Sequence, residues 1–148
     1  MLDIEYVDGD LFSKSPAGAF LAHACNCQGS WGAGIAAQFK SKYPKDYVEY
    51  LNDCRKTSPG DALITKNKII CLYTSLGFGS RVDPRKVILK NTKVSLENLR
   101  YELPFNAAVY SNKFNSGLFG VPWEETEVLI LDFLKKRPDI EWVVVSND

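Results

Sequence analysis

The chain has 148 residues, and its 18 basic and 18 acidic side chains cancel to a formal charge of zero. This length fits one domain whose core needs neither disulfides nor a structural metal. The charge balance argues against a broad basic face, so we expect no nucleic-acid partner. No apolar stretch approaches a membrane span, and the first ten residues lack the basic and apolar regions of a secretion signal. We therefore expect a single domain over residues 1–148 that is cytoplasmic, or also nuclear, does not bind membranes and is a monomer.

Two short strands and a helix are predicted at the start of the chain. Residues 3–7 (DIEYV) alternate polar and apolar side chains as a half-buried strand does, and residues 8–10 (DGD) end it with a turn. Residues 19–23 (AFLAH) are a short apolar run that suits a fully buried strand. A helix follows over 35–43, where apolar residues recur every four positions until a proline stops it.

Two further helices are predicted from their amphipathic patterns. Residues 45–54 can bury Tyr47, Val48 and Leu51 together. Residues 85–103 carry apolar or small side chains at intervals of three and four, which predicts a long helix with one buried face.

The remaining strands alternate with these helices. Residues 61–65 and 69–74 predict two adjacent strands with a tight connection, and residues 75–84 form a glycine-rich surface loop. Residues 107–111 predict a strand, and residues 142–145 (WVVV) a final, fully buried one. A last helix begins near residue 123, with acidic residues in its first turns and basic residues in its last. The alternation indicates an α/β sandwich, in which helices cover both sides of a central sheet.

The stretch His23–Ala36 (HACNCQGSWGAGIA) is the strongest candidate for a site. It follows a predicted strand and leads into a helix, and glycines at 29, 32 and 34 allow backbone conformations and close approaches that a Cβ would obstruct. Helix N-termini carry unpaired N–H groups and partial positive charge, so a phosphate is a natural occupant. Polar side chains surround this loop, among them the one histidine of the sequence. A connecting loop without a ligand is the alternative.

A second glycine loop repeats this design. Residues 115–122 (NSGLFGVP) follow a strand and lead into the last helix. If both loops lie at one end of the sheet, their amides can bind a single diphosphate; the sequence does not exclude that they lie at opposite ends, or that one is only structural. Neither loop has the GK[ST] of a nucleoside-triphosphate P-loop, and no GxGxxG opens the chain.

Four cysteines raise the question of a zinc site or disulfides, and neither fits the spacing. Cys25 and Cys27 are separated by one residue rather than two to four, and no second pair or histidine follows at ligand spacing. Reduced thiols are expected without a secretion signal. We expect Cys54 and Cys71 to be small buried residues. A thiol nucleophile at Cys25 or Cys27, with His23 as its base, is a remaining alternative.

Three motifs together resemble the ligand loops of a macrodomain. They are residues 9–11 (GDL), 23–36 and 115–126 (NSGLFGVPWEET), in this order, and more narrowly they resemble the fungal ADP-ribose 1″-phosphate phosphatases. The resemblance spans the chain but is loose between residues 75 and 104. It implies a single macrodomain with a three-layer α/β/α fold and a mixed central sheet. It also implies hydrolysis of the terminal phosphate of ADP-ribose 1″-phosphate, a by-product of tRNA splicing, without a metal or other cofactor.

The resemblance also implies roles for individual residues. Asp10 would bind the adenine amino group, and a turn residue is its alternative. Asn26 would contact the distal ribose and share the catalytic site with His23, which can pass a proton near neutral pH. A histidine that is merely buried at the end of its strand is the alternative for His23. The full set of expected ligand-binding residues is Gly9, Asp10, Leu11, Ala24, Cys25, Asn26, Trp31, Gly32, Ala33, Gly34, Ile35, Ala36, Asn115, Ser116, Gly117, Leu118, Phe119, Gly120 and Val121, with Phe119 as an apolar wall.

Two other macrodomain functions stay open. One is removal of ADP-ribose from proteins by a hydrolase related to the terminal ADP-ribose protein glycohydrolases, which are understood to use a lysine and an aspartate. Here Phe119 or Gly120 stands where that aspartate is expected, and residues 72–80 contain no lysine, which weakens this reading. The other is a non-catalytic ADP-ribose reader that uses the same pocket.

Overall fold

The structure is a computed structural model that describes residues 3–147. Its strands are β1 (Ile4–Asp8), β2 (Phe20–Asn26), β3 (Ala62–Ile64), β4 (Ile69–Ser75), β5 (Ala108–Ser111) and β6 (Glu141–Ser146). Its helices are α1 (Leu11–Lys14), α2 (Gly34–Lys42), α3 (Pro44–Asp53), α4 (Arg85–Arg100) and α5 (Trp123–Lys136), with a short 3-10 helix η1 (Gly79–Arg81).

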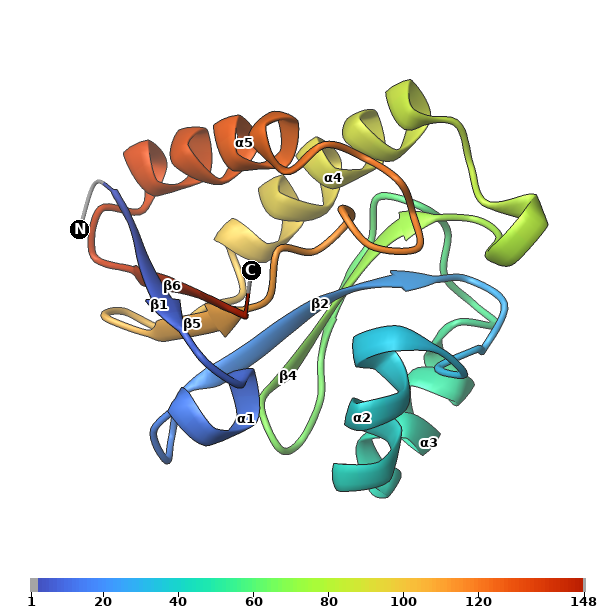
Figure 1. Ribbon diagram of the computed structural model, residues 1–148, viewed down its shortest axis with the longest axis horizontal. Coiled ribbons are helices and arrows are strands. Elements are labelled where there is room, and N and C mark those ends of the chain that lie inside the picture. The colour runs from blue at the N-terminus through green and yellow to red at the C-terminus, as the bar shows by residue number, and fades with distance from the viewer. Residues whose placement is uncertain (1–2, 148) are drawn as a thin grey trace.

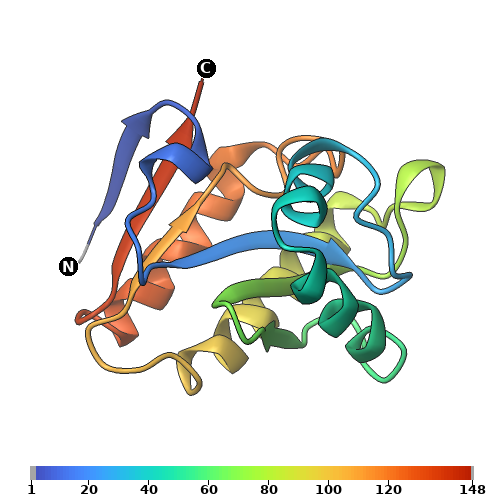
Figure 2. The ribbon, with the colours of Figure 1, turned by 90° about the horizontal axis from the view of Figure 1, so that it is seen from below.

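The six strands form one mixed sheet in the order β1-β6-β5-β2-β4-β3. Every neighbouring pair is parallel except β3 and β4, which are antiparallel and joined by the tight connection expected from the sequence. Figure 2 shows the parallel strands side by side, from β1 at one edge to β4. Because β1 pairs with β6, the first and last strands of the chain lie together.

Helices cover both faces of the sheet and make three layers. In Figure 1, α4 and α5 lie above the sheet, and α1, α2 and α3 lie below it. The buried residues divide in the same way into two apolar clusters, one against α4 and α5 and the other against α1, α2 and α3. The expected three-layer α/β/α sandwich with a mixed sheet is confirmed. No helix in the described range is both long enough and apolar enough to span a bilayer.

Most elements follow the sequence pattern, because that pattern reflects which face each element buries. The apolar or small positions of α4 lie against the sheet, and β6 is buried along residues 142–145 as expected. Two elements were missed, α1 and η1. Both are short, and α1 exists because Asp10 caps it, accepting a hydrogen bond from the Ser13 N–H at 3.0 Å.

The expected buried face of α3 is wrong in part. Val48 is 52 % exposed, whereas Asp46 and Tyr50 are fully buried. Asp46 is tolerated in the interior because Thr65 and Asn67, in the connection between β3 and β4, donate hydrogen bonds to its carboxylate. A buried carboxylate cannot be recognised from hydrophobic periodicity.

Candidate functional site

The two glycine loops lie at the same end of the sheet. Since β2 and β5 are adjacent and parallel, the loops that follow them leave at the same end of the sheet. A Cβ on Gly34 would lie 3.6 Å from Leu118 Cδ1, so the two loops touch. The possibility of opposite ends, left open by the sequence, is therefore excluded. These two segments, residues 27–33 and 112–122, are called the β2 loop and the β5 loop below.

The N-terminus of α2 presents backbone donors without partners. Its first intrahelical hydrogen bond runs from the Ala37 N–H to the Ala33 carbonyl at 3.4 Å. Within residues 3–147 no acceptor is found for the N–H groups of Gly34, Ile35 and Ala36. Ala33 has no side chain to cap the helix, and the first turn holds no acidic residue. An anion is the group that such a terminus binds best.

The β5 loop adds a second set of donors. The N–H groups of Gly117, Leu118 and Phe119 have no acceptor in the described part of the chain. The loop closes on itself through a hydrogen bond from the Val121 N–H to the Asn115 carbonyl at 2.8 Å, and Gly120 takes a φ of +72° to allow it. Leu118 is 70 % exposed beside Gly34. The two sets of amides therefore flank one surface at the carboxyl edge of the sheet.

Asn115 holds the β5 loop and does not reach outward with its side chain. Its Oδ1 accepts a hydrogen bond from the Thr74 hydroxyl at 2.9 Å, and its Nδ2 donates to the Thr92 and Thr126 hydroxyls at 3.0 and 3.3 Å. The residue is buried and has a φ of +68°, which asparagine tolerates better than most residues. Asn115 was expected among the ligand-binding residues, and that contact stays a prediction; the structure shows its side chain holding the loop.

Asn26 plays a similar part in the β2 loop. Its Oδ1 accepts hydrogen bonds from the N–H groups of Gln28 and Ser30 at 2.9 and 3.3 Å, and lies 2.9 Å from the Tyr50 hydroxyl. Its Nδ2 donates to the Ser30 carbonyl at 2.8 Å. This side chain fixes the turn that brings the loop toward α2. Asn26 is buried, and the contact of its second Nδ2 hydrogen with a ligand stays a prediction.

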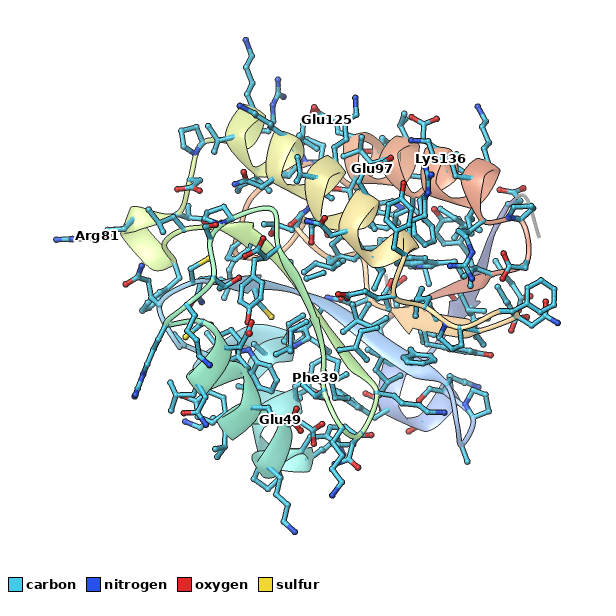
Figure 3. The ribbon with its side chains drawn as sticks, turned by 180° about the vertical axis from the view of Figure 1, so that it is seen from behind. Phe39, Glu49, Arg81, Glu97, Glu125 and Lys136 are labelled. Carbon is cyan, nitrogen blue, oxygen red and sulfur yellow. The ribbon has the colours of Figure 1, made fainter. Side chains whose placement is uncertain are left out.

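His23 lies inside the protein. Its side chain is 0 % exposed, and its ring stacks on Phe39 with centroids 4.1 Å apart and packs edge-on against Trp31 at 4.7 Å. Phe39 projects from α2 toward the sheet (Figure 3). A ring in this position does not contact a substrate at the surface of the loops. The catalytic role of His23 stays a prediction, and this burial fits the alternative of a histidine that is merely buried at the end of its strand.

Burial also argues against a thiol nucleophile at Cys25 or Cys27. Cys25 Sγ lies 3.6 Å from His23 Nε2, but both residues are buried. Burial alone would raise the pKa of Cys25; hydrogen bonding with Cys71 and the charge of His23 outweigh it and lower the pKa to about 6. Burial raises the pKa of Cys27 to about 12, with the Cys54 thiol adding to the effect. A nucleophile needs access to substrate, and neither thiol has it.

Asp10 lies at the far end of the same edge, after β1. Its side chain is exposed, and Oδ2 accepts hydrogen bonds from both the N–H and the hydroxyl of Ser13. The turn role that was the alternative is thus present, and a ligand contact through the other carboxylate oxygen remains a prediction. Gly9 precedes it with a φ of +136° and donates its N–H to the Ser146 carbonyl at the end of β6.

The other predicted residues divide by exposure. Leu11, Cys25, Trp31 and Val121 are buried and can reach a ligand only through their backbone. The exposed ones are Gly32, Ala33, Gly34, Ser116, Gly117, Leu118 and Gly120. Gly9, Ala24, Ile35, Ala36 and Phe119 are intermediate. The exposed group consists mainly of glycines and small residues, as a backbone-lined site requires.

One residue at this edge was missed. Asn112 follows the last residue of β5, and its Oδ1 is buried without a hydrogen-bond partner among the described residues. Such an orphaned acceptor is uncommon in a folded protein. A single asparagine between a strand and a glycine loop carries no signal in the sequence that would have identified it.

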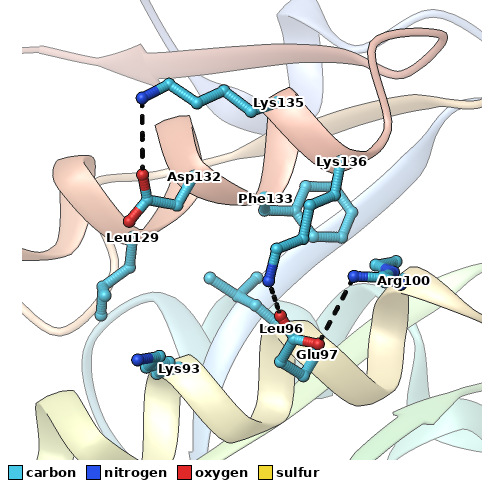
Figure 4. Close-up of a pocket in the computed structure, with 9 residues that line it drawn as sticks. All are labelled: Lys93, Leu96, Glu97, Arg100, Leu129, Asp132, Phe133, Lys135 and Lys136. Atoms are coloured by element: carbon cyan, nitrogen blue, oxygen red, sulfur yellow. Dashed lines mark hydrogen bonds and ion pairs between the residues drawn. The ribbon is translucent and has the colours of Figure 1, made fainter.

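Two further charged features of the surface can be seen in the figures. Arg81 on η1 points away from the molecule (Figure 3). A surface hollow of about 240 Å³ lies elsewhere, between α4 and α5, and most of its charged side chains form ion pairs: Asp132 with Lys135, and Glu97 with Arg100 and Lys136 (Figure 4). Glu97, for example, bonds Lys136 and lies 3.7 Å from Arg100. This hollow is on the outer helical layer and not at the loops.

Comparison with known proteins gives relatives over nearly the whole length. The family model described as Macro domain matches residues 22–74. A protein of Meyerozyma guilliermondii named ADP-ribose 1″-phosphate phosphatase is 37 % identical over 163 residues, covering 88 % of this chain and 93 % of the relative. A protein of the same name from Lodderomyces elongisporus is 40 % identical over 150 residues, covering 87 % and 91 %.

Solved structures agree on the fold. The macrodomain of Mycobacterium tuberculosis DarG superposes with a TM-score of 0.81 at 25 % identity, covering 96 % of each chain. Thermosipho africanus DarTG in complex with ADP-ribose gives a TM-score of 0.74 at 20 % identity, covering 97 % of this chain and 41 % of that one. With the similarity to the fungal proteins and the shared fold, the chain belongs to the macrodomain family.

Proposed function

We propose that this protein removes the terminal phosphate of ADP-ribose 1″-phosphate, giving ADP-ribose and inorganic phosphate. The observation that carries the proposal is the contact between the N-terminus of α2 and the β5 loop, whose unpartnered amides at residues 34–36 and 117–119 flank one surface. A diphosphate is an anion of matching chemistry for two such sets of donors. The fungal relatives that bear this activity in their names add the choice of substrate.

The ligand would lie along the carboxyl edge of the sheet. Asp10 would bind the adenine amino group through the carboxylate oxygen that does not cap α1. The α2 terminus and the β5 loop would hold the diphosphate, with Phe119 as an apolar wall. The second Nδ2 hydrogen of Asn26 would reach the distal ribose, whose hydroxyls accept as well as donate.

Catalysis would depend on positioning rather than on His23 as a direct base. Water attacks the terminal phosphorus, the bond to the ribose 1″ oxygen breaks, and that oxygen takes up a proton. Phosphoryl transfer of this kind is accelerated largely by aligning the reactants and stabilising charge on the phosphate oxygens. Asn112 is our candidate for orienting the water, because this residue at the start of the β5 loop is only partly buried, unlike His23, and its Oδ1 is an acceptor without a partner in residues 3–147.

The experiment is a phosphate-release assay with ADP-ribose 1″-phosphate, combined with calorimetric titration of ADP-ribose. We expect the wild type to release phosphate and to bind the product. Asn112→Ala should lower kcat about 10-fold or more while the Kd for ADP-ribose changes less than about 2-fold. Asn52→Ala, on the exposed side of α3, is the matched control and should behave as wild type.

Other outcomes separate the rival functions. Tight ADP-ribose binding without phosphate release identifies a reader. Release of ADP-ribose from a mono-ADP-ribosylated glutamate peptide, again without phosphate release, identifies a protein hydrolase. No heat of binding from a folded sample contradicts all three functions.

A further inference from the structure

A cluster of metal-ligating side chains lies in the core beneath the β2 loop, outside the proposed ligand site. It consists of His23 and Cys25 on β2 and Cys71 on β4. The alternation of a strand puts positions 23 and 25 on one face of the sheet, and Cys71 is the residue of β4 that pairs with His23. The spacing of cysteines along the chain gave no hint of this cluster, because its third member comes from a different strand 46 positions beyond Cys25.

The three side chains are close enough to share one ion. Their candidate ligand atoms all lie within 4.8 Å of one another, and Cys25 Sγ is 3.6 Å from His23 Nε2 and 3.8 Å from Nδ1. With metal–nitrogen and metal–sulfur bonds of about 2.0–2.3 Å, ligands around one ion lie roughly 3.5–4 Å apart. Small side-chain rotations therefore suffice to bring all three onto one ion.

A second observation points to the same place. The Trp31 indole Nε1 is buried without a hydrogen-bond partner among residues 3–147, and Trp31 is 1 % exposed. Its ring packs edge-on against His23. The indole N–H can only donate, so the partner it lacks is an acceptor. A metal-bound thiolate is such an acceptor, whereas a neutral thiol is a weak one.

The number and kind of ligands select the ion. Two thiolates and an imidazole form a soft set, which favours Cu(I) or Zn(II) over magnesium or calcium. Among the described residues, no fourth carboxylate, thiol or imidazole lies with these three groups. Phe39 and Trp31 cover the imidazole, and all three ligands are at most 2 % exposed. Zn(II) in a closed structural site takes four protein ligands, while Cu(I) is satisfied by three.

We propose that His23, Cys25 and Cys71 form a buried three-coordinate site for Cu(I), with the Trp31 indole N–H donating to a thiolate. Two thiolates and one monovalent cation leave one net negative charge, which this donor offsets. On binding, the two thiols release their protons to solvent and the copper keeps its oxidation state. The ion would link β2 to β4 directly below Asn26, and so would stiffen the base of the β2 loop. The site is independent of the function proposed above.

The test is an anaerobic titration of the full chain with Cu(I), using a chromophoric Cu(I) chelator as competitor. We expect one Cu(I) per chain and a rise in Tm when the site is filled, because an ion that binds only the folded state stabilises it. Titration after refolding in the presence of Cu(I) covers the case in which the buried site fills slowly. Absence of a strongly held equivalent in the wild type overturns the proposal, whatever the variants do.

Variants assign the ligands. Cys25→Ser and Cys71→Ser should each abolish competition with the chelator, whereas the double variant Cys27→Ser, Cys54→Ser keeps both buried thiols of the cluster and should bind as wild type. Trp31→Phe retains an aromatic ring without the N–H and should weaken binding about 10- to 100-fold, the usual effect of losing such a supporting hydrogen bond. Circular dichroism checks that each variant is folded. Binding that depends on Cys27 and Cys54 instead, or an equal affinity for Zn(II) through the same two thiols, contradicts the three-coordinate copper site.

Discussion

At the scale of single residues, substitutions of His23 test how much its buried ring contributes to the stability of the core. It is stacked on Phe39 and packs edge-on against Trp31, so its removal leaves a cavity in a fully buried part of the core. We expect His23→Ala to lower the free energy of unfolding by about 2–4 kcal/mol, as large-to-small core substitutions do. His23→Phe keeps an aromatic ring in the stack and should cost less than about 1.5 kcal/mol. Urea unfolding measures both values.

The phenylalanine variant also separates packing from proton transfer. Phe cannot exchange a proton, yet it fills most of the same space. Because the imidazole is shielded from the loops, we expect His23→Phe to retain most of the phosphatase kcat. A large loss of kcat with an unchanged ADP-ribose Kd would instead show that His23 takes part in the reaction, through an opening of the β2 loop.

The sequence identified which polar residues lie beside the glycine loops, but it did not show whether their side chains bind a ligand or hold the loop in place. Asn26 and Asn115 were expected to contact the ligand, and most hydrogen bonds of both side chains are made within the protein, where they hold a loop in place. The amino-acid type indicates hydrogen-bonding capacity, but only the tertiary structure decides whether the partner is a ligand or the protein itself. Asn112 shows the reverse, since its orphaned oxygen becomes apparent only once its neighbours are known.

At the scale of elements, the uncapped N-terminus of α2 predicts a trade between stability and binding. Ala33 has the extended conformation of an N-cap residue, with φ −149° and ψ 161°, but cannot cap. Ala33→Asp should stabilise the protein by about 1 kcal/mol, because its carboxylate satisfies an unpaired N–H and complements the helix dipole. The same carboxylate occupies and repels the place of the diphosphate, so the Kd for ADP-ribose should rise at least about 10-fold.

The control for this variant is Lys45→Glu. Residue 45 is exposed in the first turn of α3, where a negative charge is also favourable, but this turn follows the C-terminus of α2 and not the ligand edge. It should leave ADP-ribose binding unchanged. An Ala33→Asp protein that is more stable and binds ADP-ribose as wild type would show that the α2 terminus is not the phosphate site.

The joint between α4 and α5 predicts a dependence of stability on pH. Arg137, at the end of α5, donates hydrogen bonds to three carbonyls of residues 100–104 and forms a bidentate pair with Asp139. Hydrogen bonds from Arg137, and then from the Asn106 N–H, lower the pKa of Asp139. A lowered pKa in the folded state adds stability above the unfolded pKa of about 4, and this stability is lost as the pH falls below it.

Asp139→Asn should therefore unfold at a lower urea concentration than wild type at pH 7, and the gap between the two midpoints should begin to narrow below about pH 4 and close only as the pH approaches the lowered pKa of Asp139. Asp132→Asn is the control, because its carboxylate only approaches Lys135 at 3.8 Å on the exposed face of α5. A gap between Asp139→Asn and wild type that stays constant from pH 7 to pH 3 would contradict the assignment.

At the scale of the whole molecule, the order of strands and helices could be predicted because buried strands and amphipathic helices leave strong patterns. The run WVVV and the long α4 face are examples. The order of the strands in the sheet could not be predicted, because no local pattern in β5 or β2 indicates that these two strands are neighbours. That adjacency creates the site by joining the two glycine loops, and the pairing of β2 with β4 similarly brings Cys71 to Cys25. Contacts between strands far apart in the chain are the information that the sequence pattern does not contain.

The balanced charge of the molecule leads to a prediction about how the affinity for ADP-ribose depends on salt concentration. The formal net charge is zero, and the proposed cradle consists of backbone N–H groups rather than of lysine or arginine side chains. A site of this kind does not exchange bound counterions for the ligand, so its affinity should depend weakly on ionic strength. Between 50 and 500 mM NaCl we expect the Kd for ADP-ribose, measured by calorimetry, to change less than about 3-fold. A decrease in affinity of about 10-fold or more over this range would mean that basic side chains hold the diphosphate, and the loop amides would lose their assigned role.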